Sequence, residues 1–185
     1  GLLDELKNPE IPIREKMLVL QALVKLPGRM PQEMLLTAAT SRSVDWRYRV
    51  RSVVMLGFCE TATEDLLTEL KLLVLEVSEQ ESPEEMRNTA LLALGHQIYH
   101  QSREVEELAD KWFEQLDRLC ALPQFSESSV SIYAMANTRL PQAAEYLYRA
   151  LEDLDPHRRF DAATVLRLFP LPRTRDFLRR AIALE

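Results

Sequence analysis

Two histidines are the first candidates for chemistry in this chain of 185 residues. His96 and His100 stand four residues apart, so a helix would place both imidazoles on one face, where a pair can bind a metal ion. The third histidine, His157, is distant in sequence, and no cysteine lies near the pair. Histidines at the carboxyl end of a helix also interact favourably with its dipole without any ligand. We favour this second interpretation and predict no metal ion and no other cofactor.

The remaining reactive side chains form no catalytic pattern. Cys59 and Cys120 each fall near the end of an apolar helical stretch, which predicts two buried thiols rather than a disulfide framework. The sequence contains no nucleophile with a base at an informative spacing, no glycine-rich phosphate loop and no cluster of metal ligands. We therefore predict a protein that is not an enzyme.

Arginines cluster at the start of one expected helix. Arg47 and Arg51 share a helix face beside Trp46, whereas Arg49 points elsewhere. Arginine and aromatic residues are enriched at the centres of protein interfaces, so the cluster is a candidate anchor for a partner. The alternative is a solvated helix start in which Arg49 pairs with an acidic neighbour. A second basic group near the carboxyl end is either a solvated terminal face or an anion or partner site, and comprises Arg173, Arg175, Arg179 and Arg180.

The net charge of −6 is unevenly distributed. Residues 1–59 carry a formal charge of +3, residues 60–110 carry −10, and residues 111–185 carry +1. A protein that binds nucleic acid along its length needs a continuous basic stripe to neutralise phosphates, and the acidic middle third interrupts any such stripe. We therefore do not expect nucleic acid as a partner, and we interpret the acidic residues of 60–110 as a solvated surface.

Composition places the chain among globular proteins with a sizeable core, since 46% of its residues are hydrophobic. The longest apolar run, residues 72–77, contains a glutamate and is far shorter than the roughly 20 residues of a membrane span. The sequence begins without Met and inside an apolar pattern, so we expect a piece excised from a longer chain. The compartment stays open, with the cytoplasm as the default and secretion as the alternative.

Five segments repeat one helical pattern, in which a start that often carries Arg is followed by apolar residues and usually a small residue at the close. Their last positions lie 35, 38, 41 and 31 residues apart, a period typical of stacked helix pairs. The segments are 13–22, 48–57, 86–95, 128–136 and 158–167. Small residues at Gly57, Gly95 and Ala136 would let neighbouring helices approach closely.

Apolar spacing and capping residues predict about ten helices after an initial helix tail at residues 2–6. Residues 123–128 are expected to form a loop, and no segment of useful length alternates like a strand. The expected helices cover about 12–26, 31–40, 45–59, 63–78, 83–99, 104–121, 128–137, 141–153, 156–168 and 172–184.

This pattern resembles the HEAT-repeat family, whose second helix typically reads Asp, a gap, Val-Arg, an Ala-rich apolar stretch and Leu-Gly. The resemblance covers nearly the whole chain and implies a fold rather than an activity. It assigns structural roles to Arg49, Arg87 and Arg159. The matching residues are Asp45, Arg49, Leu56 and Gly57; Met86, Arg87, Ala90, Leu94 and Gly95; and Asp155, Pro156, Arg159, Ala162, Ala163 and Leu166.

A narrower resemblance links residues 86–100 and 131–147 to the helical domain of the large lipid-transfer proteins, such as vitellogenin and microsomal triglyceride transfer protein. Ala136, Asn137 and Pro141 match that family, although it prefers Gly where Ala136 stands, and the cysteines that often lie between its two segments are missing. This resemblance implies a helical domain packed around a lipid-binding β-sheet domain.

The sequence thus predicts an all-α protein with one HEAT-like domain over residues 1–185, a right-handed α-α superhelix of about five antiparallel helix pairs. The expected function is a non-enzymatic scaffold that binds a partner protein, or neighbouring domains of its own chain, on the row of second helices. Lipid is a partner only under the lipid-transfer alternative, and a nucleic-acid-modifying repeat protein is a third hypothesis. The expected contact residues are Trp46, Arg47, Arg51, Tyr99 and Arg158.

Overall fold

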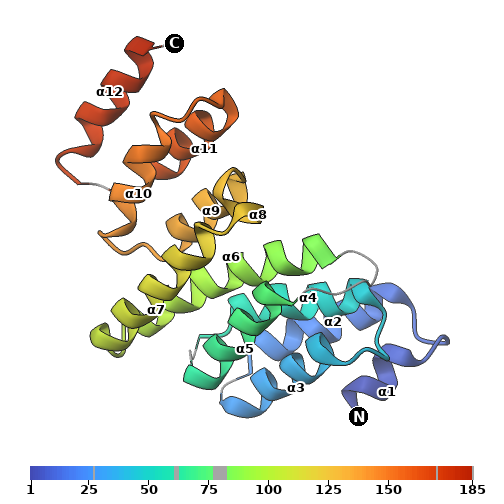
Figure 1. The fold of residues 1–185 in the computed structure, drawn as a ribbon. Helices are drawn as coiled ribbons and strands as arrows, with labels where there is room; N and C mark the ends of the chain where they lie inside the picture. Colours follow the sequence, from blue (N-terminus) through green and yellow to red (C-terminus); the bar gives the residue numbers. More distant parts are fainter. Residues whose placement is uncertain (27, 61–62, 77–82, 170, 185) are drawn as a thin grey trace.

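The computed structural model describes residues 1–26, 28–60, 63–76, 83–169 and 171–184, and these residues form helices and no strand (Figure 1). In chain order the helices are α1 (Leu2–Lys7), α2 (Ile13–Val24), α3 (Arg29–Thr40), α4 (Trp46–Gly57), α5 (Glu64–Leu75), α6 (Pro83–Ser102), α7 (Glu106–Cys120), α8 (Pro123–Ser126), α9 (Ser129–Asn137), α10 (Ala143–Ala150), α11 (Pro156–Leu166) and α12 (Thr174–Leu184). The all-helical prediction is confirmed for this part of the chain.

Side-chain caps explain where several helices begin. The Asp45 carboxylate accepts a hydrogen bond from the Arg47 N–H at 2.9 Å, and the Thr63 hydroxyl accepts one from the Leu66 N–H at 3.2 Å. Asp155 caps α11 in the same way, through the His157 N–H. Each bond satisfies a donor that the first turn of a helix would otherwise leave unpaired. The cap expected at Ser82 lies outside the described residues.

Several elements differ from the helices expected from sequence; for example, α6 continues to Ser102 rather than ending near residue 99, and α10 covers Ala143–Ala150 rather than 141–153. Residues 123–126 form the single turn α8 instead of loop, because Pro123 stands in the first turn, where its missing N–H costs nothing. Helix α3 begins at Arg29, two residues before Pro31, which the first turn accommodates for the same reason.

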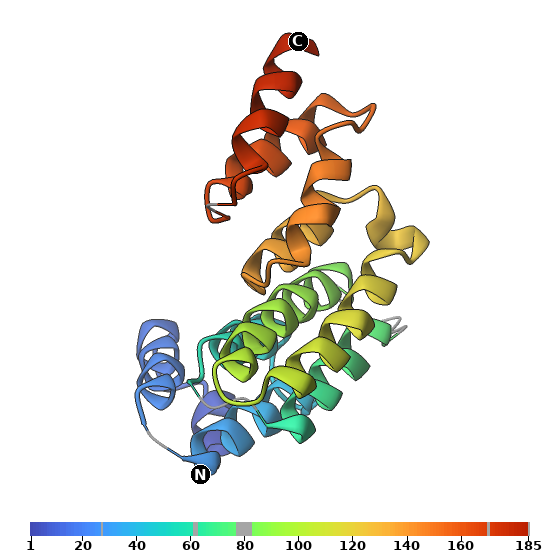
Figure 2. The same cartoon turned by 90° about the vertical axis from the view of Figure 1, so that its left-hand side faces the viewer.

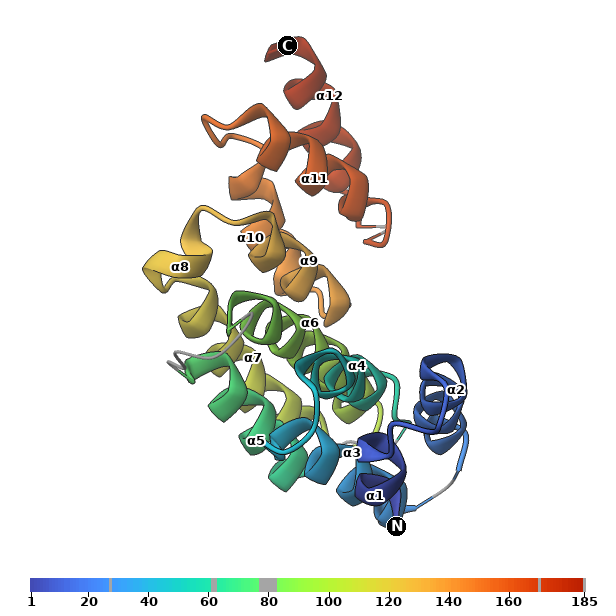
Figure 3. The ribbon, with the colours of Figure 1, turned by 90° about the vertical axis from the view of Figure 1, so that its right-hand side faces the viewer.

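The helices stack into an elongated molecule whose amino and carboxyl ends lie at opposite ends (Figures 1 and 2). We call α2, α4, α6, α9 and α11 the second helices, and each contacts the next one along the chain. The first helices α3, α5, α7 and α10 lie beside them: α3 packs against α4, α5 and α7 pack against α6, and α10 packs against α9 and α11. Figure 3 shows α5 and α7 on one side of the lower stack and α4 and α6 on the other.

The start of the stack is less regular. Helix α1 packs against α3, while α2 packs against both α3 and α4. The buried Lys16 ammonium on α2 donates to the Leu6 carbonyl oxygen of α1 at 2.9 Å and so connects these two helices.

Glycine marks the closest approaches between second helices. A Cβ atom built on Gly57 of α4 would lie 3.2 Å from both Cα and Cβ of Ala93 on α6. A Cβ on Gly95 of α6 would overlap the Ala134 carbonyl oxygen of α9 and come within 3.0 Å of its carbonyl carbon. Ala136 on α9 is also buried. The second helices therefore pack backbone to backbone.

The first helices meet through long polar side chains instead. Exposed ion pairs contribute only about 0–1 kcal/mol each to stability, so the tight packing lies on the second-helix side. The contacts are Arg29 with Asp65 at 3.0 Å, Lys111 with Glu64 at 2.6 Å, Lys71 with Gln115 at 2.9 Å, and Gln142 with Asp110 at 2.7 Å.

One hydrophobic core runs along the stack and includes Leu20, Leu56, Leu91, Ile132 and Leu166, none of which is exposed. Each hairpin shares this core with its neighbours, which is how stacked repeats bury faces that a single pair leaves open. Among the described helices, none combines the length and the apolar character that a bilayer span requires.

Candidate functional site

Four rings gather where α4 and α6 end. The His96 ring lies 5.3 Å from Phe58, 5.2 Å from His100 and 6.3 Å from Tyr99, measured between centroids. The Tyr99 and His100 rings are 5.6 Å apart. We call these four residues, with Arg139 described below, the ring cluster.

Helix periodicity and the end of α4 position the ring cluster. His96, Tyr99 and His100 stand at positions i, i+3 and i+4 of α6 and therefore share a face. Phe58 follows the last residue of α4, so its ring projects from the helix end. The buried Gln97 amide holds that end in place, since its nitrogen donates to carbonyl oxygens of residues 56, 57 and 59 at 2.7, 3.2 and 2.9 Å.

Arg139 completes the ring cluster from the segment after α9. Its guanidinium lies 4.8 Å from the centroid of the Tyr99 ring, within the range of a cation–π contact. Its φ of 51° is in the left-handed region, which costs about 1–2 kcal/mol for a residue with a Cβ. The backbone there orients the arginine toward α6.

The surroundings of both histidines favour the neutral imidazole. Burial lowers the pKa of His96 below 6.5, and Arg139 lowers it further, against a hydrogen bond with the Gly57 backbone. Burial also lowers the pKa of His100, as do His96, Arg103 and Arg139, against the attraction of Glu60. At neutral pH the ring cluster is therefore an aromatic surface whose positive charge comes from arginine.

The described residues offer neither a metal site nor a reactive thiol. They contain no group of three His, Cys, Asp or Glu side chains that could hold a metal ion. Burial raises the pKa of Cys59 to about 11 and that of Cys120 to about 12, so both thiols are protonated at neutral pH. A protonated, buried thiol is a poor nucleophile.

The expected contact residues are spread over three helices. Trp46, Arg47 and Arg51 lie in the first two turns of α4, whereas Tyr99 lies near the end of α6 with the other rings. Arg47 is exposed and forms an ion pair with Asp45 at 2.8 Å, while the buried Nε of Arg51 lacks a hydrogen-bond partner.

Arg158 is the expected contact residue that the fold buries, with 6% of its surface exposed. Its Nε donates to Asp153 at 2.7 Å and its Nη1 to the Ser128 carbonyl oxygen at 2.6 Å. Tyr146 and Cys120 lie with it around a cavity of about 220 Å³. Arg158 therefore connects α11 to the cap of α9 and offers little surface to a partner.

Of the three arginines to which the HEAT resemblance assigns structural roles, two donate hydrogen bonds to backbone carbonyl oxygens. The buried Arg49 donates from Nε to the Ala39 carbonyl oxygen in the last turn of α3 at 2.9 Å. Arg159 donates to the carbonyl oxygens of Asp153 and Leu154 before α11, at 3.0 and 3.1 Å. Arg87 is half-buried on α6.

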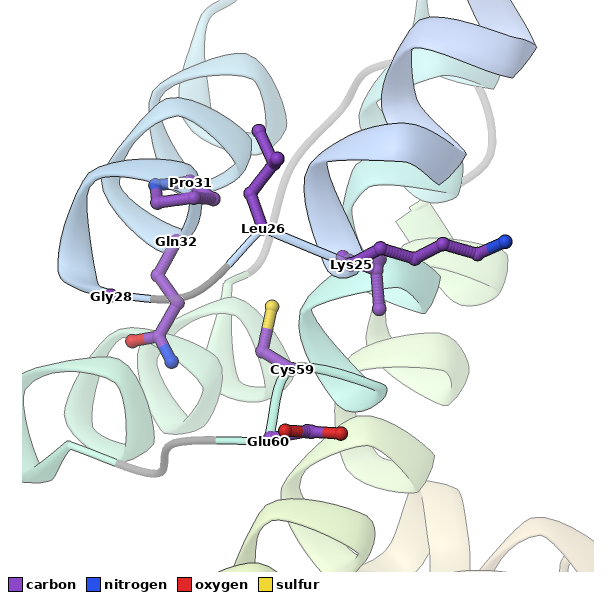
Figure 4. Close-up of a pocket in the computed structure, with 8 residues that line it drawn as sticks. Lys25, Leu26, Gly28, Pro31, Gln32, Cys59 and Glu60 are labelled. Carbon is purple, nitrogen blue, oxygen red and sulfur yellow. The ribbon is translucent and has the colours of Figure 1, made fainter.

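A second cavity, of about 140 Å³, lies between the end of α2, the start of α3 and the end of α4 (Figure 4). The Cys59 sulfur and the Gln32 amide approach one another across it, while the Lys25 side chain extends away. Since the thiol is neutral and the lysine points outward, the cavity brings no charged pair together.

Two of the arginines near the carboxyl end, Arg173 and Arg180, contact α12 or its neighbours. Arg173 pairs with Glu145 at 3.0 Å, and Arg180 lies 5.7 Å from the Phe177 ring centroid. The Phe177 ring in turn stacks on Tyr148 at 4.1 Å and so attaches α12 to α10.

The exposed sides of four second helices join into one surface, which we call the second-helix face. Phe58 and His96 connect α4 to α6 through their rings. The Asn137 amide on α9 donates to the Leu92 carbonyl oxygen of α6 at 3.2 Å. Tyr133 on α9 donates to Asp161 of α11 at 2.7 Å. We define the face by the residues of these contacts and of the ring cluster: Phe58, Leu92, His96, Tyr99, His100, Tyr133, Asn137, Arg139 and Asp161.

Sequence analysis did not single out Phe58, Tyr133, Arg139 or Phe160. Three of them are aromatic residues that are exposed by 54%, 37% and 69%, in the order Phe58, Tyr133 and Phe160. The signal that could have found them is an aromatic residue at a position of a repeated helix where the pattern otherwise places polar residues.

Comparison with protein-family profiles, curated proteins and solved structures finds no match to this chain.

Proposed function

We propose that the chain is a non-enzymatic HEAT-like scaffold, a right-handed superhelix of about five antiparallel helix pairs that binds a partner protein. The partner docks on the second-helix face, with the ring cluster at its centre. The observation that carries this proposal is the run of aromatic side chains from α4 to α11, which are partly exposed although the core is well filled.

The packing supports the assignment of the face. Because second helices approach through glycine and alanine whereas first helices meet through long side chains, the stack is narrower on the second-helix side. A surface on the narrow side of a curved stack is concave and can surround a bound segment. Tyrosine, phenylalanine and arginine are residues that supply much of the binding energy when a partner excludes water from them.

Site-specific cross-linking tests the proposal. A photo-reactive phenylalanine analogue replaces Phe58, and the protein is produced in cells of the organism from which it comes. Leu72 on α5 is the matched control, because it is 53% exposed against 54% for Phe58 and belongs to a first helix. We expect a discrete cross-linked protein from position 58, absent from position 72, whose yield falls when Tyr99→Ala is added.

Identical products from both positions would contradict a specific face, and so would the lack of any product from position 58. Circular dichroism of each variant confirms that the helices are intact before yields are compared.

A further inference from the structure

An open groove lies at the carboxyl end of the stack, where the end of α11 meets the first turns of α12. Its volume is about 590 Å³, larger than that of either cavity described above. The residues that matter for what it can bind are apolar or arginine. They are Leu166, Phe169, Leu171 and Leu178 among the apolar residues, and Arg167, Arg175 and Arg179.

The groove lies where the packing pattern of the stack places a helix. Helix α12 is a first helix at the end of the stack, and it packs against α10 and α11 (Figure 1). The earlier first helices α3, α5 and α10 each also pack against the second helix that follows them, α4, α6 and α11 respectively. Among the described residues no helix takes this place beside α12.

The preceding repeat shows the same surface with its cover in place. Residues 136–148 align with residues 167–179, 31 positions later, and in both segments a Leu-Pro pair comes shortly before a first helix. The equivalent pairs are Ala136 and Arg167, Ala144 and Arg175, and Leu147 and Leu178.

Exposure differs sharply between the two repeats. Leu147 and both alanines are at most 1% exposed, and they belong to α9 and α10, against which α11 packs. In the groove the equivalent Leu178 is half-buried and both arginines are exposed. The groove is therefore the surface that a following second helix covers elsewhere in the stack.

The groove also carries positive charge that its own carboxylate does not balance. Arg167 and Arg175 are exposed, and neither forms an ion pair or a hydrogen bond with a described residue. Arg179 forms an exposed ion pair with Asp176 at 4.0 Å, which contributes little. Asp176 is the only carboxylate in the sequence of α12, which carries three arginines.

No neighbouring carboxylate on α10 is available to these arginines. Glu145 is the acidic residue of that helix, and it already binds Arg173 outside the groove at 3.0 Å.

Arginine at position 167 determines how closely a helix can approach. Gly57 of α4 and Gly95 of α6 close the corresponding repeated segments, and they let the next second helix pack against the backbone. Arg167 fills that space, so a helix in the groove must lie at side-chain distance. Guanidinium groups covered by such a helix need carboxylates, because burial of an unpaired charge is costly. The groove thus favours an acidic helix over a further repeat packed as α9 packs on α6.

From these observations we propose that the groove between α11 and α12 binds an amphipathic helix of a partner protein. The apolar side chains of that helix pack on Leu171 and Leu178, and its carboxylates bind Arg167 and Arg175. An apolar groove with charged edges is a common receptor for such a helix. The site is separate from the ring cluster, so this inference goes beyond the proposed function and does not depend on it.

Fluorescence anisotropy with designed helices tests the proposal. The probe is a fluorescein-labelled peptide of about 18 residues, or five helical turns, with Leu along one face and Glu on both flanks. The comparison probes are the same peptide with Lys for each Glu, the same peptide with two central prolines that break the helix, and a single-stranded DNA of equal charge. We expect the Glu peptide to bind at least about tenfold more tightly than the other three, and more weakly as NaCl rises.

Charge reversal localises the binding. Arg167→Glu and Arg175→Glu should each weaken the Glu peptide by at least about fivefold and strengthen the Lys peptide. Leu178→Ser should weaken the Glu peptide as well. Arg14→Glu is the matched control, because Arg14 is an exposed arginine of α2 at the other end of the stack, and its reversal should change neither affinity. The melting temperature of each variant shows that it is folded.

The inference is wrong if the Glu peptide fails to bind at millimolar concentration or if any comparison probe binds as tightly. It is also wrong if Arg14→Glu weakens binding as much as Arg175→Glu. Sedimentation equilibrium of the protein alone adds a further check, since a dimer that Arg175→Glu dissociates would show that a second copy, not a partner, fills the groove. The cross-link from position 58 reports on the second-helix face, so an intact cross-link without Glu-peptide binding would overturn this inference and leave the scaffold proposal standing.

Discussion

Gly95 of α6 lies directly against the peptide carbonyl of Ala134 in α9, with no room for a side chain between them. The Ala134 carbonyl belongs to the backbone of α9 and cannot move aside as a flexible side chain could. An added methyl group on Gly95 must therefore push the two helices apart. Glycine in a helix interior otherwise costs up to about 1 kcal/mol relative to alanine. Close packing is therefore the reason that glycine occupies this position.

We predict that Gly95→Ala lowers stability by at least about 2 kcal/mol, or roughly 4–8 °C in melting temperature for a chain of this size, and that Gly95→Leu is worse. Gly57→Ala is the matched control. Its Cβ would lie 3.2 Å from Ala93, a distance that a small shift can relieve, so it should cost clearly less. Thermal unfolding followed by circular dichroism measures both. A Gly95→Ala protein that melts within a degree of the wild type would disprove the packing role.

The repeat pattern allowed the all-helical structure and the position of most helices to be predicted, because apolar spacing and capping residues report local structure directly. The position of Gly95 at a helix contact followed from the alignment of five similar segments. The ring cluster could not be predicted in this way. Phe58 and Arg139 lie just after helix ends, and neither local spacing nor composition indicates that they meet His96 and Tyr99, which come from another hairpin.

Arg158 illustrates a different limit of sequence analysis. An arginine at a helix start is usually solvated, and its burial here depends on Asp153 and on the Ser128 carbonyl oxygen 30 residues earlier in the chain. Only the tertiary arrangement brings these three groups together.

Gln97 and Gln101 provide a matched pair of buried amides on one face of α6. The Oε1 atoms of both amides are buried without a hydrogen-bond partner, but the Gln97 nitrogen donates to three carbonyl oxygens at the end of α4. We predict that Gln97→Leu costs about 1–3 kcal/mol, because the carbonyl groups lose their donor. Gln101→Leu should be neutral or stabilising, since it removes an unsatisfied polar atom. Urea denaturation distinguishes the two, and equal losses would refute the difference.

The histidines of the ring cluster should make stability depend on pH. Their pKa values are lowered in the folded protein, first by burial and then by neighbouring cations, so below about pH 6.5 the unfolded chain binds more protons than the folded one. Their contribution is complete above pH 6.5 and is lost as pH falls through the folded-state pKa values. We expect the melting temperature to fall between pH 7.5 and pH 5, and to fall less in the His96→Gln/His100→Gln variant. The same slope in both proteins would show that these histidines do not cause it.

The ion pair between Arg158 and Asp153 should matter far more than the exposed pairs of the first helices. The Arg158 side chain is 7% exposed and that of Asp153 is 29% exposed, whereas Lys111 and Glu64 are 60% and 55% exposed. Removal of one partner from a buried pair leaves the other without compensation, which costs several kcal/mol, while water replaces a lost partner at the surface. We therefore predict that Arg158→Ala lowers stability by about 2 kcal/mol or more and that Lys111→Ala changes it by less than about 1 kcal/mol.

Thermal unfolding of these two variants at one salt concentration provides the measurement. Arg158→Ala should also leave the yield of the partner cross-linked from position 58 unchanged at a temperature where the variant is folded, because its guanidinium already binds Asp153 and Ser128. A variant that keeps the wild-type melting temperature but loses that cross-linked partner would reverse this assignment. Arg158 would then be a contact residue, as its position in the sequence first indicated, and the binding surface would extend to the cavity beside Tyr146.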